Sequence, residues 1–68
     1  MTIELNGTAV ELSDGASVAE AVARLGSEPQ RRGVAVAVDG EVVPRSAWSS
    51  TVLTEGQRVE IVGAVQGG

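Results

Sequence analysis

The sequence predicts one small α+β domain, in which a single helix covers one face of a mixed β-sheet of four to five strands. Two observations support this prediction. Short strand-like segments are separated by Asn-Gly and Asp-Gly turn signals, and only residues 17–25 have apolar side chains at helical spacing. A chain of 68 residues has no room for a second domain. Because it contains no Cys and 43% of its residues are hydrophobic, its stability must come from a compact aliphatic core.

The chain begins with a predicted β-hairpin. Residues 2–5 and 8–12 both alternate apolar and polar positions, as strands with one buried face do. Asn6-Gly7 stands between them, and this pair favours a type I′ turn because both central residues of that turn have positive φ. The inward-facing positions are expected to be Ile3, Leu5, Val10 and Leu12.

The predicted helix follows the hairpin. Ser17 and Glu20 have the spacing of a capping box, in which each side chain accepts a hydrogen bond from the other residue's backbone N–H. Gly26 is well placed to end the helix in a left-handed conformation, and residues 27–33 are expected to form a loop. The apolar stripe of the helix consists of Val18, Ala21, Val22 and Leu25.

A buried strand is predicted next. Residues 34–38 are continuously apolar and rich in β-branched side chains, and their length favours a strand over a helix. Asp39-Gly40 is a second turn signal, and it leads into a short strand at 41–43. Because Pro44 has no N–H to donate, this strand is expected to lie at an edge of the sheet or to end there.

The last part of the domain is predicted to be irregular over residues 45–54, with Trp48 and Leu53 contributing to the core. A final strand follows at 58–63 and places Val59 and Ile61 inward.

This order of elements allows the first and last strands to lie side by side and parallel at the centre of the sheet. That is the β-grasp arrangement of ubiquitin. We therefore expect a single β-grasp domain over residues 1–63 and a flexible C-terminal tail over residues 64–68. A fully extended tail of this length would reach about 17 Å, which is far enough to enter the active site of a partner.

The tail ends in Gly67-Gly68, and the chain contains no Cys, His or Lys. Glycine has no Cβ, so such a tail can pass through a narrow slot. A terminal carboxylate has a pKa of about 3.3–3.7, is ionised at neutral pH and is a poor electrophile until a leaving group such as AMP activates it. The chain itself has no thiol or imidazole for catalysis. The sequence therefore indicates a carrier whose carboxyl group at Gly68 is acted upon, and not an enzyme.

Three motifs carry a resemblance to a known family: V-P-R-S-A-W at 43–48, L-T-E-G-Q at 53–57, and G-G at 67–68. Together with the strand that precedes them, they resemble the signature of ThiS, the sulfur carrier of thiamin biosynthesis. The resemblance covers the whole chain in length and element order. Gln57 departs from it, since the family usually has Asp there, and we expect this difference to affect the local turn and to leave function intact.

The resemblance implies a reaction sequence carried out by partner enzymes. A ThiF-like adenylating enzyme would use ATP to convert the carboxyl of Gly68 into an acyl-adenylate. Sulfur from the persulfide of a cysteine desulfurase would then replace the adenylate and give a thiocarboxylate. A ThiG-like thiazole synthase would take up that sulfur. The carrier itself would bind no cofactor.

Other functions share the fold and the tail. A MoaD-like carrier would donate the same sulfur to molybdopterin synthesis, although that family is usually longer and lacks V-P-R-x-x-W. A ubiquitin-like modifier would attach Gly68 to a lysine of a target protein, and a β-grasp binding module would use no tail chemistry at all.

Further residues are expected to contact partners. Val65, Gln66 and Gly67 would thread into a partner's active site, and Val65 would gain from docking in an apolar groove. Glu60, Val62 and Arg45 are possible interface residues, although the simpler interpretation of Arg45 is a side chain that lies in solvent after an edge strand.

The charge and hydropathy of the chain limit the other functions that it could have. The net charge of −4 argues against binding to a nucleic-acid backbone. No apolar segment approaches the length that spans a bilayer, and no set of side chains has the spacing of a metal site. We expect a cytoplasmic protein that is monomeric when isolated.

Overall fold

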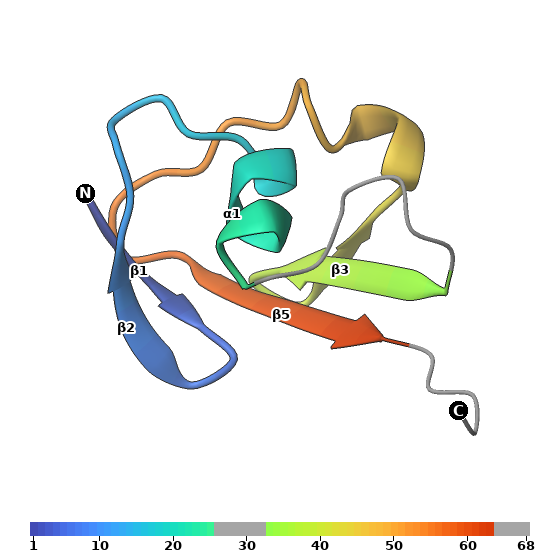
Figure 1. Ribbon diagram of the computed structural model, residues 1–68, viewed down its shortest axis with the longest axis horizontal. Coiled ribbons are helices and arrows are strands. Elements are labelled where there is room, and N and C mark those ends of the chain that lie inside the picture. Colours follow the sequence, from blue (N-terminus) through green and yellow to red (C-terminus); the bar gives the residue numbers. More distant parts are fainter. Residues whose placement is uncertain (26–32, 64–68) are drawn as a thin grey trace.

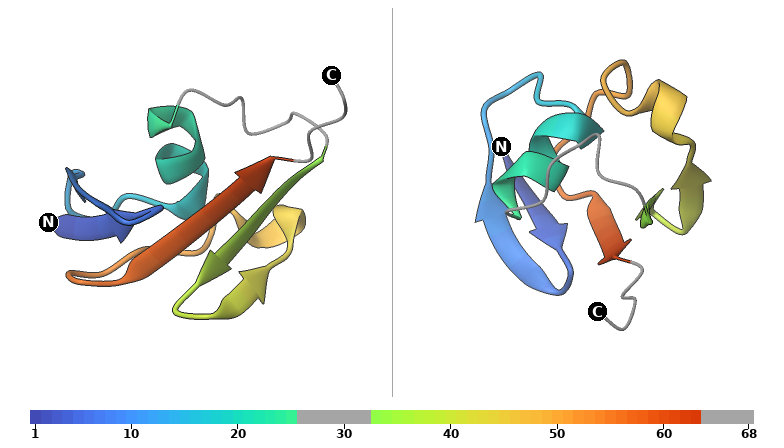
Figure 2. Two further views of the ribbon diagram at one scale, coloured as in Figure 1. Left: turned by 90° about the horizontal axis from the view of Figure 1, so that it is seen from below. Right: turned by 45° about the vertical axis from the view of Figure 1, so that its right-hand side comes forward.

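The computed structural model describes residues 1–25 and 33–63 of the chain (Figure 1). Its described strands form one five-stranded sheet in the order β2-β1-β5-β3-β4. Helix α1 covers one face of this sheet (Figure 2). The elements are β1 (Thr2–Leu5), β2 (Thr8–Glu11), α1 (Val18–Arg24), β3 (Val34–Val38), β4 (Glu41–Val43), the 3₁₀ helix η1 (Arg45–Ala47) and β5 (Arg58–Gly63).

The central strand pair confirms the prediction of a β-grasp fold. β5 pairs in parallel with β1, where Glu4 lies opposite Arg58 and Leu5 opposite Val59. On its other side β5 runs antiparallel to β3, from Val34 opposite Gly63 to Val38 opposite Val59. β4 is the outermost strand on that side, as Pro44 predicted. The predicted tail, residues 64–68, and the predicted loop around Pro29 lie outside the described residues.

Both hairpin turns have the conformation that their sequences predict. Asn6 and Asp39 each have φ of 50°, and the glycines that follow them, Gly7 and Gly40, have φ of 85° and 86°. Two successive positive φ values are the mark of a type I′ turn. These turns fix the registers of β1 with β2 and of β3 with β4.

The core lies between α1 and the sheet. Its largest fully buried side chains come from the central strands, from α1 and from Leu53. Trp48 is also buried, as predicted, at 3% exposure. Val10 and Leu12 are only half-buried and pack against the edge of this core. The buried cluster comprises Ile3, Leu5, Val18, Ala21, Val22, Val36, Trp48, Leu53, Val59 and Ile61.

Helix α1 runs between the predicted N-cap Ser17 and the C-cap Leu25, but the buried part of its apolar stripe stops before Leu25. Leu25 was expected on the buried face, but it is the C-cap residue and is 44% exposed. At the other end of α1, the structure contains one half of the capping box. The Oγ of Ser17 accepts a hydrogen bond from the backbone N of Glu20 over 3.3 Å. The Glu20 carboxylate makes no return bond to Ser17 among the described residues. Ser17 also forms a β-bridge with Val52, whose hydrogen bonds come from the backbone N of Val18 and the backbone N of Leu53.

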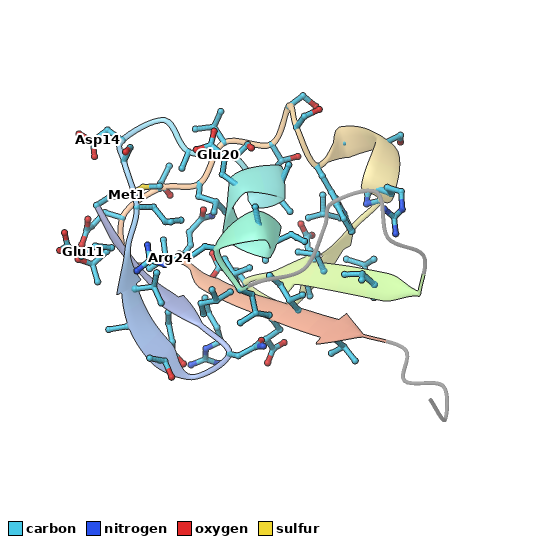
Figure 3. The ribbon with its side chains drawn as sticks, viewed as in Figure 1. Met1, Glu11, Asp14, Glu20 and Arg24 are labelled. Atoms are coloured by element: carbon cyan, nitrogen blue, oxygen red, sulfur yellow. The ribbon has the colours of Figure 1, made fainter. Side chains whose placement is uncertain are left out.

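Helix α1 is tied to the first hairpin at its C-terminal end. Arg24 donates from Nη1 to the carbonyl oxygen of Glu11 over 3.1 Å, and Figure 3 shows its side chain reaching from the end of α1 toward β2. β2 itself ends at Glu11, one residue before the predicted end. The pairing continues nevertheless, because the backbone N of Leu12 donates to the carbonyl oxygen of Met1 over 2.9 Å.

Residues 45–54 are more regular than predicted. Arg45–Ala47 form η1, and the backbone N of Ala47 donates to the carbonyl oxygen of Pro44 over 2.8 Å. A single helical turn has no apolar periodicity, so the sequence pattern could not reveal it. None of the helices in the described part of the chain has the length and hydrophobicity needed to cross a membrane.

Candidate functional site: the end of the central strand and the outer face of the sheet

β5 leads directly into the segment that carries the predicted carboxyl group. It runs between β1 and β3 and ends at Gly63, on the side of the molecule opposite to the N-terminus (Figure 1). Val65, Gln66, Gly67 and Gly68 lie outside the described residues, so their predicted roles remain predictions. The described part of the site is therefore the end of β5 and the surface around it.

Two turn side chains hold β5 from opposite flanks. On the β3–β4 side, the Oδ1 of Asp39 accepts a hydrogen bond from the backbone N of Arg58 over 3.0 Å. On the β1–β2 side, Asn6 accepts from the backbone N of Ile61 over 2.8 Å and donates from Nδ2 to the carbonyl oxygen of Ile61 over 3.1 Å. The sequence pattern indicated both residues only as turn formers. Neither contact could be predicted from the sequence, because the partners are far apart along the chain. Asp39 and Arg58 are 19 positions apart, and Asn6 and Ile61 are 55 positions apart.

The face of the sheet opposite to α1 carries an exposed apolar patch next to the end of β5. Val62 is 63% exposed and Val42 is 76% exposed. Val62 lies opposite Ala35 on β3, and Val42 lies opposite Ala37 on the same strand, so the four side chains share one face. We call Ala35, Ala37, Val42 and Val62 the outer-face patch.

Charged side chains border the outer-face patch along β5 and β1. Arg58 and Glu60 continue the outward side of β5, and the Nε of Arg58 lies 3.7 Å from Oε2 of Glu4. Both partners of this ion pair are largely exposed, so it contributes little to stability. Glu60 has no ion-pair partner among the described residues. A shallow depression of about 580 Å³ lies beside them and is lined in part by Glu4, Glu60 and Val62.

The sequence prediction of an outward side on β5 is thus confirmed for Glu60 and Val62. Arg45, the third predicted interface residue, lies elsewhere. It belongs to η1, and its guanidinium carbon is 4.6 Å from the ring centroid of Trp48, whose side chain packs in the core on the α1 side of the sheet. The structure therefore separates Arg45 from Glu60 and Val62.

Gln57, the departure from the family pattern, takes part in the turn before β5. Its Oε1 accepts a hydrogen bond from the backbone N of Thr54 over 2.8 Å, and its Nε2 lies 3.4 Å from Oδ2 of Asp39. Gln57 thus takes part in the local turn, and the effect of having it there in place of Asp stays a prediction. Within residues 1–25 and 33–63, no group of three acidic, His or Cys side chains is placed to hold a metal ion.

These features define a β-grasp protein in which the central strand leads into the Gly-Gly segment. The ThiS family model matches residues 3–68, and the chain belongs to the ThiS family. The crystal structure of the thiamine biosynthesis protein ThiS from Geobacter metallireducens is 28% identical, with a TM-score of 0.79 and complete coverage of both chains. A solution structure of a thiamine biosynthesis protein from the same organism is 30% identical, with a TM-score of 0.80, and covers all of this chain and 88% of the other. No curated protein gives a significant match.

Proposed function

We propose that this chain is the sulfur carrier of a thiamin biosynthesis pathway, and that the carboxyl group of Gly68 is its working group. The observation that carries the proposal is the extent of the family match, which runs through residue 68 and so includes both terminal glycines. The Geobacter metallireducens proteins of the same fold are described as thiamine biosynthesis proteins. The composition agrees with a carrier, since the chain has no Cys or His to serve as nucleophile or base.

The chemistry begins with activation of the Gly68 carboxylate by a ThiF-like enzyme. The carboxylate oxygen attacks the α-phosphorus of ATP, pyrophosphate leaves, and an acyl-adenylate forms. The terminal sulfur of a persulfide, supplied through a cysteine desulfurase, then attacks the acyl carbon and AMP leaves. Cleavage of the resulting S–S bond by a thiol releases the thiocarboxylate. Every nucleophile in this sequence after the first comes from a partner, because the carrier has no thiol.

The thiocarboxylate would then donate its sulfur to a ThiG-like thiazole synthase. In both encounters the segment 64–68 enters the partner's active site, with Val65, Gln66 and Gly67 in the entrance. No cofactor would reside on the carrier, since ATP and the persulfide are bound by its partners.

The outer-face patch and Glu60 are our proposed docking surface for these partners. Val62 is the patch residue nearest to the end of β5, so a partner that receives the tail would also cover this part of the sheet. An exposed apolar patch with a charged border is typical of protein interaction sites. If Arg45 contacts a partner, it does so at a separate place, because it lies on η1 against Trp48.

An intact-mass measurement tests the proposal. The chain is incubated with ATP, a persulfide donor and an adenylating enzyme that is active on a known ThiS protein. We expect a gain equal to the replacement of one oxygen by sulfur, and no gain when Gly68 is deleted. Absence of the gain in the intact chain would contradict the proposal. Thiazole and molybdopterin acceptors tested side by side then separate it from the MoaD-like alternative.

A further inference from the structure

The two turns that flank β5 have the same backbone conformation but different side chains. Asn6 and Asp39 both have φ of 50°. Asp39 receives the N–H of Arg58, the first residue of β5, at 3.0 Å. Asn6 binds Ile61 with both a donor and an acceptor, at 3.1 and 2.8 Å. One turn therefore holds the start of β5, and the other holds it close to its end.

The contact of Asn6 extends the parallel pairing of β1 with β5 beyond the end of β1. The last backbone bond on this side runs from the N of Asn6 to the carbonyl oxygen of Val59 over 2.9 Å. β1 then ends and the chain turns away into the hairpin. A side-chain amide offers one acceptor and two donors, so it can replace the next peptide group of the missing strand. Without it, the N–H and C=O of Ile61, a residue only 6% exposed, would lose their partners.

Beyond Ile61, β5 is paired on one side only. Val62 lies opposite Ala35 and Gly63 opposite Val34, both on β3. Asn6 is thus the last hydrogen-bonded contact that β5 makes on the β1 side among the described residues. We propose that Asn6 is a positioning residue, whose side-chain amide fixes the end of β5 and thereby sets the direction in which residues 64–68 leave the domain toward the activating enzyme. This inference rests on the proposed carrier function.

The chemical demands of this position select asparagine. The residue must accept positive φ, which Asn, Asp and Gly do most readily, and it must both donate and accept a hydrogen bond. Glycine has neither group, and an ionised aspartate has no donor. Asp39 faces two donors, the backbone N of Arg58 and Nε2 of Gln57, so a carboxylate is sufficient there.

The test compares Asn6→Gly with Asp39→Gly, because both variants keep a turn residue that tolerates positive φ and each releases one flank of β5. Steady-state adenylation is measured with the carrier as the varied substrate, and amide hydrogen exchange is followed at Arg58, Ile61 and Val62. Urea titrations followed by Trp48 fluorescence establish that each variant is folded under the assay conditions.

For Asn6→Gly we expect exchange at Ile61 and Val62 to rise about tenfold relative to Val36, as for the loss of a buried backbone partner. The kcat of adenylation should fall about tenfold, with KM nearly unchanged because the outer-face patch is intact. Asp39→Gly should raise exchange at Arg58 and leave kcat unchanged. Asn6→Asp, which retains the acceptor and loses the donor, should fall between wild type and Asn6→Gly.

Equal losses of kcat in Asn6→Gly and Asp39→Gly would overturn the inference, since they would reflect general destabilisation of β5. Wild-type kcat in Asn6→Gly would also overturn it. If the wild-type chain itself is not adenylated, the proposed function fails, and the positioning role fails with it. The exchange data then still decide separately whether Asn6 holds β5, because wild-type exchange at Ile61 in Asn6→Gly would contradict that structural role.

Discussion

The indole Nε1 of Trp48 donates a hydrogen bond to the carbonyl oxygen of Val43 over 2.9 Å. This bond joins the two ends of the segment V-P-R-S-A-W, which carries much of the family resemblance. Between them, Pro44 starts the 3₁₀ turn in an extended conformation, and Arg45 lies over the indole ring. The motif is therefore explained by local folding: it ends edge strand β4 and places an aromatic side chain in the core.

Replacing Trp48 with Phe should destabilise the domain by about 1–3 kcal/mol. The substitution removes the hydrogen bond to Val43 and leaves part of the indole volume empty, and both effects raise the free energy of the folded state. Urea denaturation followed by circular dichroism measures the loss. Arg45→Ala is the control, since a cation–π contact at an exposed site is worth about 0.5–1 kcal/mol. A larger loss for Arg45→Ala than for Trp48→Phe would contradict this account of the motif.

Much of the fold could be predicted because local signals and the global fold agree. Asn6-Gly7 and Asp39-Gly40 indicated the two type I′ turns, and alternation along residues 58–63 indicated which side chains of β5 face outward. Contacts that depend on distant parts of the chain could not be predicted. The binding of Asn6 to Ile61 is one example, and it appears only once β1 and β5 lie side by side.

Leu25 shows a second limit of sequence patterns. It continues the apolar spacing of the helix, and its backbone N still donates to the carbonyl oxygen of Ala21, yet its side chain is 44% exposed. Periodicity indicates which residues share a face of the helix, but which of them are buried depends on how much of that face the rest of the fold covers. For the functional site, the sequence predicted the exposure of Glu60 and Val62, and their contact with a partner stays a prediction.

Replacing Val62 with Glu should weaken binding to the adenylating enzyme about tenfold or more, because a charge would be buried in the docking surface beside the end of β5. The fold should be unaffected, since Val62 is 63% exposed and surface substitutions usually change stability by less than about 0.5 kcal/mol. Isothermal titration calorimetry measures the Kd. Val52→Glu is the matched control, because Val52 is 56% exposed but bridges to Ser17 at the start of α1, away from the outer-face patch. Equal weakening by both substitutions would argue against a docking role for the patch.

Two glycines near β5 should respond differently to a methyl group. Gly56 has φ of 81° and no atom near the position of an added Cβ, so Gly56→Ala should cost about 1–2 kcal/mol from backbone strain alone. Gly63 has equal space around it and no positive φ, so Gly63→Ala should change stability by less than about 0.5 kcal/mol. Urea titration followed by Trp48 fluorescence compares the two variants. If Gly63→Ala loses as much stability as Gly56→Ala, the prediction is contradicted, and the end of β5 has less room for a side chain than its backbone geometry indicates.

Replacing Gln57 with Asp introduces the residue that the sequence resemblance leads us to expect at this turn, and it should destabilise this chain by about 0.5–1 kcal/mol. Nε2 of Gln57 lies 3.4 Å from Oδ2 of Asp39, so the substitution removes a donor and brings two carboxylates close together. Because Asp39 is exposed, added salt should screen this repulsion, and the loss should shrink between low ionic strength and 1 M NaCl. Gln57→Asn, which keeps an uncharged amide, is the control and should show no salt dependence. A loss that is independent of salt would assign the effect to the missing hydrogen bond, and a gain in stability would contradict the role of Gln57 in holding Asp39.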